Sequence, residues 1–203
     1  MAPKSSSKEY IETETGNKVS RKATILGTQQ ITLGGKSVLG TDCTVRGDLY
    51  RTLPLTSNSS SSSSKDPPSA SASAADVRSN SIAIGRYTYI SPSAILRPPH
   101  KSSSGTYTYY PLRLGEHVLV GEGAVVQAAS IGNFVQIGRG AVIGRFVVVK
   151  DHVRVLEGAV VPDWAVLPPG TVWGGRPARV LGDLPEGEGE GGDLRGLWKA
   201  VGR

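Results

Sequence analysis

The sequence predicts an all-β protein in which short parallel strands coil around a central core. Large aliphatic residues recur every six residues, which suits the two-residue period of a strand and not the 3.6-residue period of a helix. Glycine follows ten of eighteen such positions, where about two would be expected from 26 glycines in 203 residues. The fourth residue after the aliphatic one is often small or β-branched, as at Cys43, Ala124 and Ala141.

The repeat predicts which side chains point into the core. The step is six residues without a break from Ile131 to Trp173. Burying one large aliphatic side chain contributes roughly 1.5–3 kcal/mol, so a long column of them makes a sufficient core. The predicted inward residues are Leu26, Leu33, Leu39, Val45, Ile84, Ile90, Leu96, Leu114, Val120, Val126, Ile131, Ile137, Ile143, Val149, Val155, Val161, Leu167 and Trp173.

Composition and charge exclude several classes of protein. No apolar run approaches the ~20 residues that cross a bilayer, and "MAPKSSSKEY" lacks a hydrophobic signal core. We therefore expect a cytoplasmic protein without membrane insertion. Cys43 is the only cysteine, which excludes an internal disulfide and fits a small packed residue. The net charge of +6 comes from scattered Lys and Arg residues, which favours a solvated surface over a nucleic-acid interface.

Two insertions and one deletion interrupt the repeat. Residues 52–81 contain "TSNSSSSSSKDPPSASASAA", which cannot bury apolar surface, and we expect a disordered insert there. Residues 97–113, "RPPHKSSSGTYTYYPLR", are expected to form a protruding loop. Its tyrosines, Tyr107, Tyr109 and Tyr110, fit either a protein-binding surface or packing against the wall. One residue is missing from the repeat at "VQAAS".

The breaks divide the chain into three parts. Residues 1–22 are predicted to form an N-terminal arm that covers one end of the coil, residues 23–181 the β-helix domain, and residues 182–203 a linker and tail. The tail has weak helical spacing, and a short helix docked on the wall is one possibility for it.

The repeat resembles the hexapeptide-repeat, left-handed parallel β-helix family. Three hexapeptides make one triangular turn in that family, so the resemblance implies about six turns and a left-handed coil. The family includes γ-class carbonic anhydrases and acyltransferases. The stretch "TVRGDL" resembles a signature of the anhydrase branch, which implies that Arg46 and Asp48 have a structural role.

The anhydrase resemblance does not extend to the metal ligands. Three histidines hold the metal in that branch, and the corresponding positions here are Arg97, Glu122 and Gln127. Arginine stays charged and has no acceptor atom, and glutamine is a poor zinc ligand. We therefore predict no metal and no cofactor.

An acyltransferase is the other enzymatic alternative. It needs a general base, usually histidine, and "WGGRPARV" resembles the end of the coil in several acetyltransferases. His100 lies in the proline-containing loop without a recognisable carboxylate beside it. His117, Phe134 and His152 occupy equivalent repeat positions, so they are expected to stack as a surface ladder.

A second surface ladder is expected from charged residues. Glu122, Arg139 and Glu157 share the third position of their hexapeptides, once the deletion is allowed for. They should stack as an acid–base–acid row with a structural role. Exposed pairs of this kind contribute only ~0–1 kcal/mol each.

Longer segments resemble the dynactin subunit 5 family. They are "KEYIETETGNKVSRKATILGTQQITLGGKSVLGTDCTVRGDL", "AILRPPHK", "YYPLRLGEHVLVGEGAVVQAASIGNFVQIG" and "GDLPE". The resemblance implies a non-catalytic subunit of the pointed-end complex, associated with the cytoskeleton. Its implied partners are dynactin subunit 6, subunit 4, the pointed-end actin-related protein and cargo adaptors of dynein. Our candidate partner-binding residues are Arg97, His100, Lys101, Tyr107, Tyr109, Tyr110, His117, Phe134 and His152.

Overall fold

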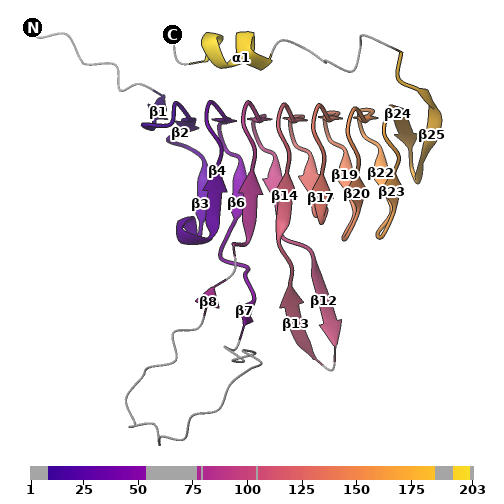
Figure 1. Ribbon diagram of the computed structural model, residues 1–203, viewed down its shortest axis with the longest axis horizontal. Coiled ribbons are helices and arrows are strands. Elements are labelled where there is room, and N and C mark those ends of the chain that lie inside the picture. Colours follow the sequence, from indigo (N-terminus) through magenta and orange to yellow (C-terminus); the bar gives the residue numbers. More distant parts are fainter. Residues whose placement is uncertain (1–8, 54–76, 79, 104, 186–193, 202–203) are drawn as a thin grey trace, which may run out of the picture.

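The chain forms a left-handed parallel β-helix, as predicted, whose three walls are β-sheets. Figure 1 shows the coil from the side. The computed structural model describes residues 9–53, 77–78, 80–103, 105–185 and 194–201. Three sheets, here called A, B and C, form the walls, and each of six coils contributes one parallel strand to each sheet. The predicted number of turns is therefore confirmed. Sheet A also contains β24 (Thr171–Gly175), which follows the sixth coil, and an antiparallel strand at each end.

Every strand of the coil is short. Sheet A contains β1 (Tyr10–Glu12), β2 (Lys18–Ser20), β5 (Val38–Leu39), β10 (Tyr89–Ile90), β15 (Leu119–Val120), β18 (Gln136–Ile137), β21 (Arg154–Val155), β24 (Thr171–Gly175) and β25 (Ala178–Asp183). Sheet B contains β3 (Thr24–Leu26), β6 (Thr44–Arg46), β11 (Ile95–Leu96), β16 (Val125–Val126), β19 (Val142–Ile143) and β22 (Val160–Val161). Sheet C contains β4 (Ile31–Leu33), β9 (Ile82–Ile84), β14 (Leu112–Leu114), β17 (Ser130–Ile131), β20 (Val148–Val149) and β23 (Val166–Leu167).

The six-residue repeat fixes how consecutive coils contact each other. Val120 pairs with Ile137 on the next coil, and both side chains are buried in the core. The backbone N–H of Gly121 donates to Ile137 O at 2.8 Å. A Cβ atom on Gly121 would lie 2.6 Å from the backbone N of Arg139, so the close approach of coils requires glycine at this position.

The predicted inward column is wrong at its first member. Leu26 is 41% exposed, and Ile25 takes the inward place by pairing with Val45. The cause is the short 3₁₀ helix η1 (Thr28–Gln30), which extends the first corner beyond the six-residue repeat. At the other end, Trp173 is only half-buried, although it packs against the core.

Both insertions leave the coil at the same corner, between sheets B and C, which we call the BC corner (Figure 1). β7 (Thr52–Leu53) pairs antiparallel with β8 (Val77–Arg78), so the segments that lead into and out of the first insertion are neighbours. The disorder predicted for this insertion concerns mainly residues 54–76, which lie outside the described residues. The second insertion forms a protruding hairpin of β12 (His100–Ser103) and β13 (Thr106–Tyr109).

An antiparallel strand closes each end of sheet A. At the N-terminal end, β1 pairs antiparallel with β2, which pairs in parallel with β5. β2 therefore belongs to the first coil, although it falls within the residues assigned above to an arm. At the C-terminal end, β25 folds back antiparallel on β24.

A short C-terminal helix, α1 (Leu194–Ala200), packs on the N-terminal part of the coil (Figure 1). Leu194 is buried, and Trp198 Nε1 donates to Gly16 O at 2.8 Å. Lys18 Nζ donates to the carbonyls of Trp198, at 2.7 Å, and Val201 at the C-terminal end of the helix. A cation is favourable at that end of the helix dipole. None of the helices that the structure describes has the length and hydrophobicity needed to span a bilayer.

Ile137→Ala tests the core. Ile137 is 1% exposed, and its truncation should lower the free energy of unfolding by about 2–5 kcal/mol because a cavity replaces the buried side chain. Urea denaturation measures this loss. Val166→Ala is the matched control, because Val166 is 59% exposed and should change stability by less than about 0.5 kcal/mol. Equal effects of the two substitutions would contradict the inward register.

Lys18→Ala tests the docking of α1. Removing the ammonium leaves the C-terminal carbonyls of α1 without their donor, so the helix should detach while the coil stays folded. Tryptic cleavage after Arg195 should become at least about tenfold faster, as for the loss of a charge-assisted hydrogen bond worth roughly 1.5–3 kcal/mol. Lys150→Ala, at an exposed lysine far from α1, should leave cleavage unchanged. Unchanged cleavage in Lys18→Ala would show that Lys18 does not hold the helix.

Candidate functional site

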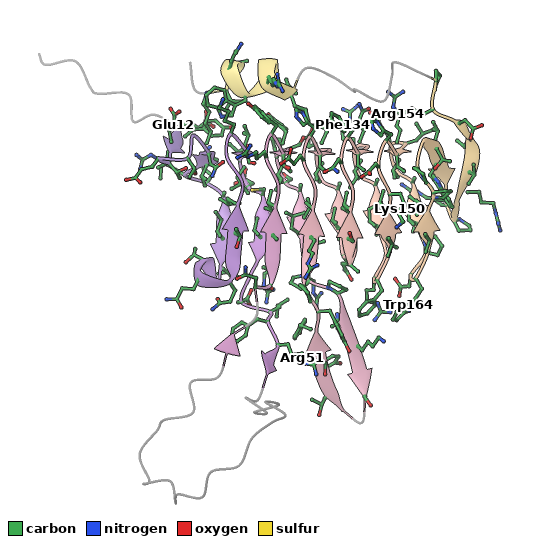
Figure 2. The ribbon with its side chains drawn as sticks, in the orientation of Figure 1. Glu12, Arg51, Phe134, Lys150, Arg154 and Trp164 are labelled. Atoms are coloured by element: carbon green, nitrogen blue, oxygen red, sulfur yellow. The ribbon has the colours of Figure 1, made fainter. Side chains whose placement is uncertain are left out.

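Aromatic rings and a lysine gather at the BC corner beside the hairpin. Phe146 and Trp164 stack with ring centroids 4.3 Å apart and planes at 11°, and Tyr110 meets Phe146 edge-on at 5.2 Å. Lys101 Nζ lies 4.7 Å from the Trp164 ring centroid and 5.4 Å from that of Phe146. Trp164 is 58% exposed and is labelled at this edge in Figure 2. The corner thus presents a basic and aromatic surface to solvent.

The base of the hairpin carries two polar atoms without a partner among the described residues. They are Arg97 Nε and His100 Nδ1, and both atoms are buried. The His100 ring meets Tyr107 and Tyr109 at centroid distances of 5.6 and 5.7 Å. Buried polar atoms without hydrogen bonds are costly, so the pair offers donors or acceptors to a ligand, a partner or water.

His100 stays neutral to a lower pH than a free histidine. Burial lowers the pKa of His100, the positive charges of Arg97 and Arg145 lower it further, and Asp163 acts in the opposite direction. Asp163 is already engaged by Arg145, whose Nη2 lies 2.8 Å from Asp163 Oδ2.

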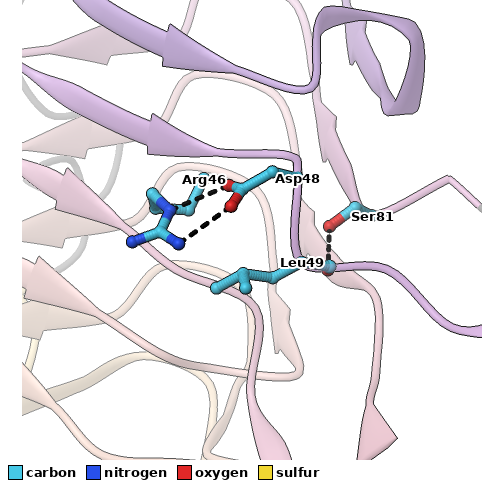
Figure 3. A network of polar contacts seen from close by, with 4 residues as sticks. All are labelled: Arg46, Asp48, Leu49 and Ser81. Atoms are coloured by element: carbon cyan, nitrogen blue, oxygen red, sulfur yellow. Dashed lines mark hydrogen bonds and ion pairs between the residues drawn. The ribbon is translucent and has the colours of Figure 1, made fainter.

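Arg46 and Asp48 form a forked ion pair at the same side of the coil (Figure 3). Arg46 Nε and Nη2 donate to the two carboxylate oxygens of Asp48, both at 2.8 Å. These hydrogen bonds hold the pKa of Asp48 below its usual range. A side chain on the intervening Gly47 would overlap Ile31, so glycine is required between the two charged residues. Ser81 Oγ donates to Leu49 O at 2.6 Å, and this hydrogen bond attaches the residue after Asp48 to the start of β9.

A ladder of four stacked rings lies on the CA corner, where sheet C leads into sheet A of the next coil. His117 and Phe134 stack at 4.8 Å, and Phe134 and His152 at 5.0 Å, with planes within 7°. Tyr87 extends the ladder, 5.0 Å from His117. The guanidinium of Arg195 from α1 lies 5.1 Å from the Tyr87 ring, so the helix covers the N-terminal end of the ladder.

The third corner, between sheets A and B, carries charges instead of rings. Arg139 Nη2 lies 3.2 Å from Glu157 Oε1, and both side chains are largely exposed. Glu122 lines the same shallow groove with Arg139, Glu157 and Arg176. Arg176 Nε donates to Gly158 O at 2.6 Å, which fixes its side chain against the wall of this groove.

The positions considered for an enzyme do not assemble into a recognised centre. Arg97 and Gln127 occupy equivalent places after β11 and β16, whereas Glu122 lies at a different corner. Within the described ranges, no three His, Cys, Asp or Glu side chains gather as a metal site would require. Cys43 is buried, and burial raises the pKa of its thiol to about 11, so it is a poor nucleophile.

The nine candidate partner-binding residues lie on two separate corners. Arg97, His100, Lys101 and the three tyrosines belong to the BC corner, and His117, Phe134 and His152 to the CA corner. The sequence analysis did not select Tyr87, Phe146 or Trp164. All three occupy the third place after an inward aliphatic residue, as His117 does, so the signal was present in the repeat.

The profile of the dynactin subunit 5 family matches residues 70–191, which is more than half of the chain. The chain belongs to the dynactin subunit 5 family. Dynactin subunit 5 of Dictyostelium discoideum is 35% identical over 122 residues, which cover 60% of this chain and 46% of that relative. The chain thus spans about half the length of the curated relative that it matches.

Solved structures share the fold at low sequence identity. A hexapeptide transferase family protein from Anaplasma phagocytophilum superposes with a TM-score of 0.53 at 18% identity, covering 91% of this chain and 86% of that one. Perosamine N-acetyltransferase from Caulobacter crescentus superposes with a TM-score of 0.52 at 16% identity, covering 82% and 57%. At these identities the likeness establishes the fold alone.

His100 should make the stability of the protein depend on pH. Its pKa in the folded chain is below the unfolded value of 6.5, so the unfolded chain binds more protons as pH falls through 6.5. The free energy of unfolding should therefore decrease from pH 7.5 towards pH 5.5. His100→Gln should flatten part of this dependence in urea titrations of the two proteins. Parallel pH profiles for the two proteins would contradict the lowered pKa.

Proposed function

We propose that this chain is a non-catalytic structural and adaptor subunit of the dynactin pointed-end complex. In this proposal it pairs with its β-helix sister, dynactin subunit 6, beside subunit 4 and the pointed-end actin-related protein. It supports the attachment of cargo adaptors to dynein, in the cytoplasm and on the cytoskeleton. The observation that carries the proposal, besides family membership, is the exposed aromatic and basic surface at the BC corner.

The composition of this surface is that of a protein-binding site. Tyrosine, tryptophan and arginine are enriched among residues that contribute most to binding at interfaces. Trp164 and Tyr107 are 58% and 61% exposed, and Lys101 is held over the rings. Desolvation by a partner would strengthen the interaction between the lysine and the rings, which is worth roughly 0.5–2 kcal/mol.

Rigidity of the wall supports a scaffold role. Phe146 and Trp164 stand on corners of consecutive coils, and the backbone N–H of Trp164 donates to Arg145 O at 2.8 Å. The rings are therefore placed by the backbone of the coil. A surface that is ordered before binding loses less conformational entropy on association.

The acyltransferase alternative receives little support from the site. A histidine base is normally oriented by a carboxylate that accepts from one ring nitrogen. His100 Nδ1 has no hydrogen-bond partner among the described residues. A thermal shift with acetyl-CoA that disappears in His100→Gln would revive this alternative.

Tyr110→Ala tests the proposed surface. Tyr110 packs on Phe146 and beneath Lys101, so its loss should weaken co-purification of the pointed-end subunits by at least about tenfold. Tyr109→Ala should weaken it in the same direction. The unfolding midpoint should change little, because neither ring belongs to the buried core. The measurement is quantitative mass spectrometry of the complexes that a tagged version of each variant captures from cells.

Two matched variants locate the contact. Tyr89→Ala removes a half-buried tyrosine from sheet A and should retain the partners. Phe134→Ala removes the middle ring of the CA corner and shows whether that ladder also contributes. Normal capture by Tyr110→Ala and Tyr109→Ala would exclude the BC corner as the main contact. A wild-type chain that captures no dynactin subunit would overturn the proposed function itself.

A further inference from the structure

The two ends of the coil differ in the backbone N–H and C=O groups that they leave available for a further strand. Within sheets B and C, each coil donates N–H groups forward to carbonyls of the next coil. Gly144 N donates to Val161 O and Lys150 N to Leu167 O, both at 3.0 Å. The equivalent positions one coil later, eighteen residues on, are Pro162 and Pro168.

Proline removes one of the two forward N–H groups from each of these sheets at the C-terminal end; the other belongs to Val160 and to Val166, the equivalents of Val142 and Val148. Proline has no N–H group, and its ring occupies space that a further strand would need. β25 closes sheet A at this end. The core is also covered here, because Val161 and Leu167, the inward residues of the last strands of sheets B and C, are fully buried. The C-terminal end is therefore less suited than the N-terminal end to accept another strand.

The N-terminal end is open in sheets B and C. β3 and β4 stand at the edges of these sheets, and no further strand among the described residues lies beyond them. Thr24 N donates forward to Cys43 O and Gly34 N to Ile84 O. In a parallel sheet, neighbouring residues direct their polar groups to opposite sides, so Ile25 and Leu33 direct their N–H and C=O groups outward. No proline interrupts residues 23–34.

Within the part of the chain that the structure describes, the core is incompletely covered at the same end. Ile25 and Leu33 are only half-buried although their side chains point inward, and Leu26 adds exposed apolar surface beside them. An open strand edge with apolar side chains promotes pairing with another chain. Among the described residues, an antiparallel strand closes sheet A alone at this end, namely β1.

We infer that the N-terminal end of the coil binds an extended segment of a different protein, which adds as a strand along β3 and β4. Its backbone would satisfy the outward groups of Ile25 and Leu33, and alternate apolar side chains would cover the core. The C-terminal end of a second copy fits less well, because Pro162 and Pro168 lack N–H groups that the carbonyls of β3 and β4 would accept. The inference deepens the proposed function, on which it rests, by naming where and how a partner binds.

Ile25→Pro tests the strand addition, and Ile25→Ala is its matched control. Both variants lose the isoleucine side chain, but only proline also removes the outward N–H group. Proline is tolerated on an edge strand, so the coil should remain folded. When each variant is co-expressed with dynactin subunits 4 and 6 and the pointed-end actin-related protein, Ile25→Pro should assemble at least about tenfold less than Ile25→Ala. Equal assembly of the two variants would overturn the inference.

Hydrogen exchange of the wild-type chain tests the same inference without substitutions. The amides of Ile25 and Leu33 should exchange rapidly in the isolated chain and become protected in the complex, while those of Val160 and Val166 should not change. A complex in which Ile25 and Leu33 still exchange rapidly would overturn the inference and leave the proposed function standing. A wild-type chain that forms no complex would overturn both. A dimer of the isolated chain with these amides already protected would show that a second copy occupies the edge, and would also overturn the inference.

Discussion

The hydrogen-bond ladder between successive coils is the constraint on which the rest of the structure depends. Each strand pairs with the strand one coil later, as Gln136 pairs with Arg154 and Ile137 with Val155, eighteen residues away. Residues at equivalent places are therefore brought together about 4.8 Å apart. The single-residue deletion before Ile131 is absorbed at one corner, and the pairing of Leu114 with Ile131 is kept. A repeat in the sequence thus becomes a row of contacts along the axis, whether the residues are aliphatic, aromatic or charged.

The same constraint explains where the chain tolerates insertions. An added segment must leave and return without shifting the pairing of the strands on either side. Both described strand pairs that leave the coil do so at the BC corner, on consecutive coils, and each is antiparallel. The hairpin thereby comes to lie beside Phe146 and Trp164, which belong to later coils of the same corner. α1 instead lies at the CA corner, against Tyr87, so the added elements that the structure describes are distributed over two corners.

Most of the fold could be predicted from the sequence because it follows from one repeated local rule. Inward residues such as Val120 and Ile137 were correctly identified, since the rule applies without change in the middle of the chain. Leu26 was misplaced because η1 lengthens the first corner, and no repeat precedes it to fix the register. The contact of Lys101 with Trp164 could not be predicted, because it joins an insertion to a distant coil, and the repeat carries no information about the direction of an insertion.

The residue that turns the chain at each corner determines whether that corner presents side chains that a partner can recognise. The turning residue adopts a left-handed conformation, with φ of 55° at Phe134 and His152 and 66° at Trp164. This conformation costs roughly 1–2 kcal/mol for a residue with a side chain, and stacking of an aromatic pair returns about 0.5–1.5 kcal/mol. Rings therefore persist at these corners because equivalent residues on neighbouring coils are also planar. On the later coils of the AB corner the turning residues are glycines, among them Gly140 and Gly158, which avoid the cost and offer no ring. Arg176 lies against the bare backbone there, whereas Asp42 and Ser93 turn two earlier coils of this corner. On these coils the choice between glycine and a stacked ring thus makes the AB corner a shallow charged groove, and the BC and CA corners candidate contact surfaces.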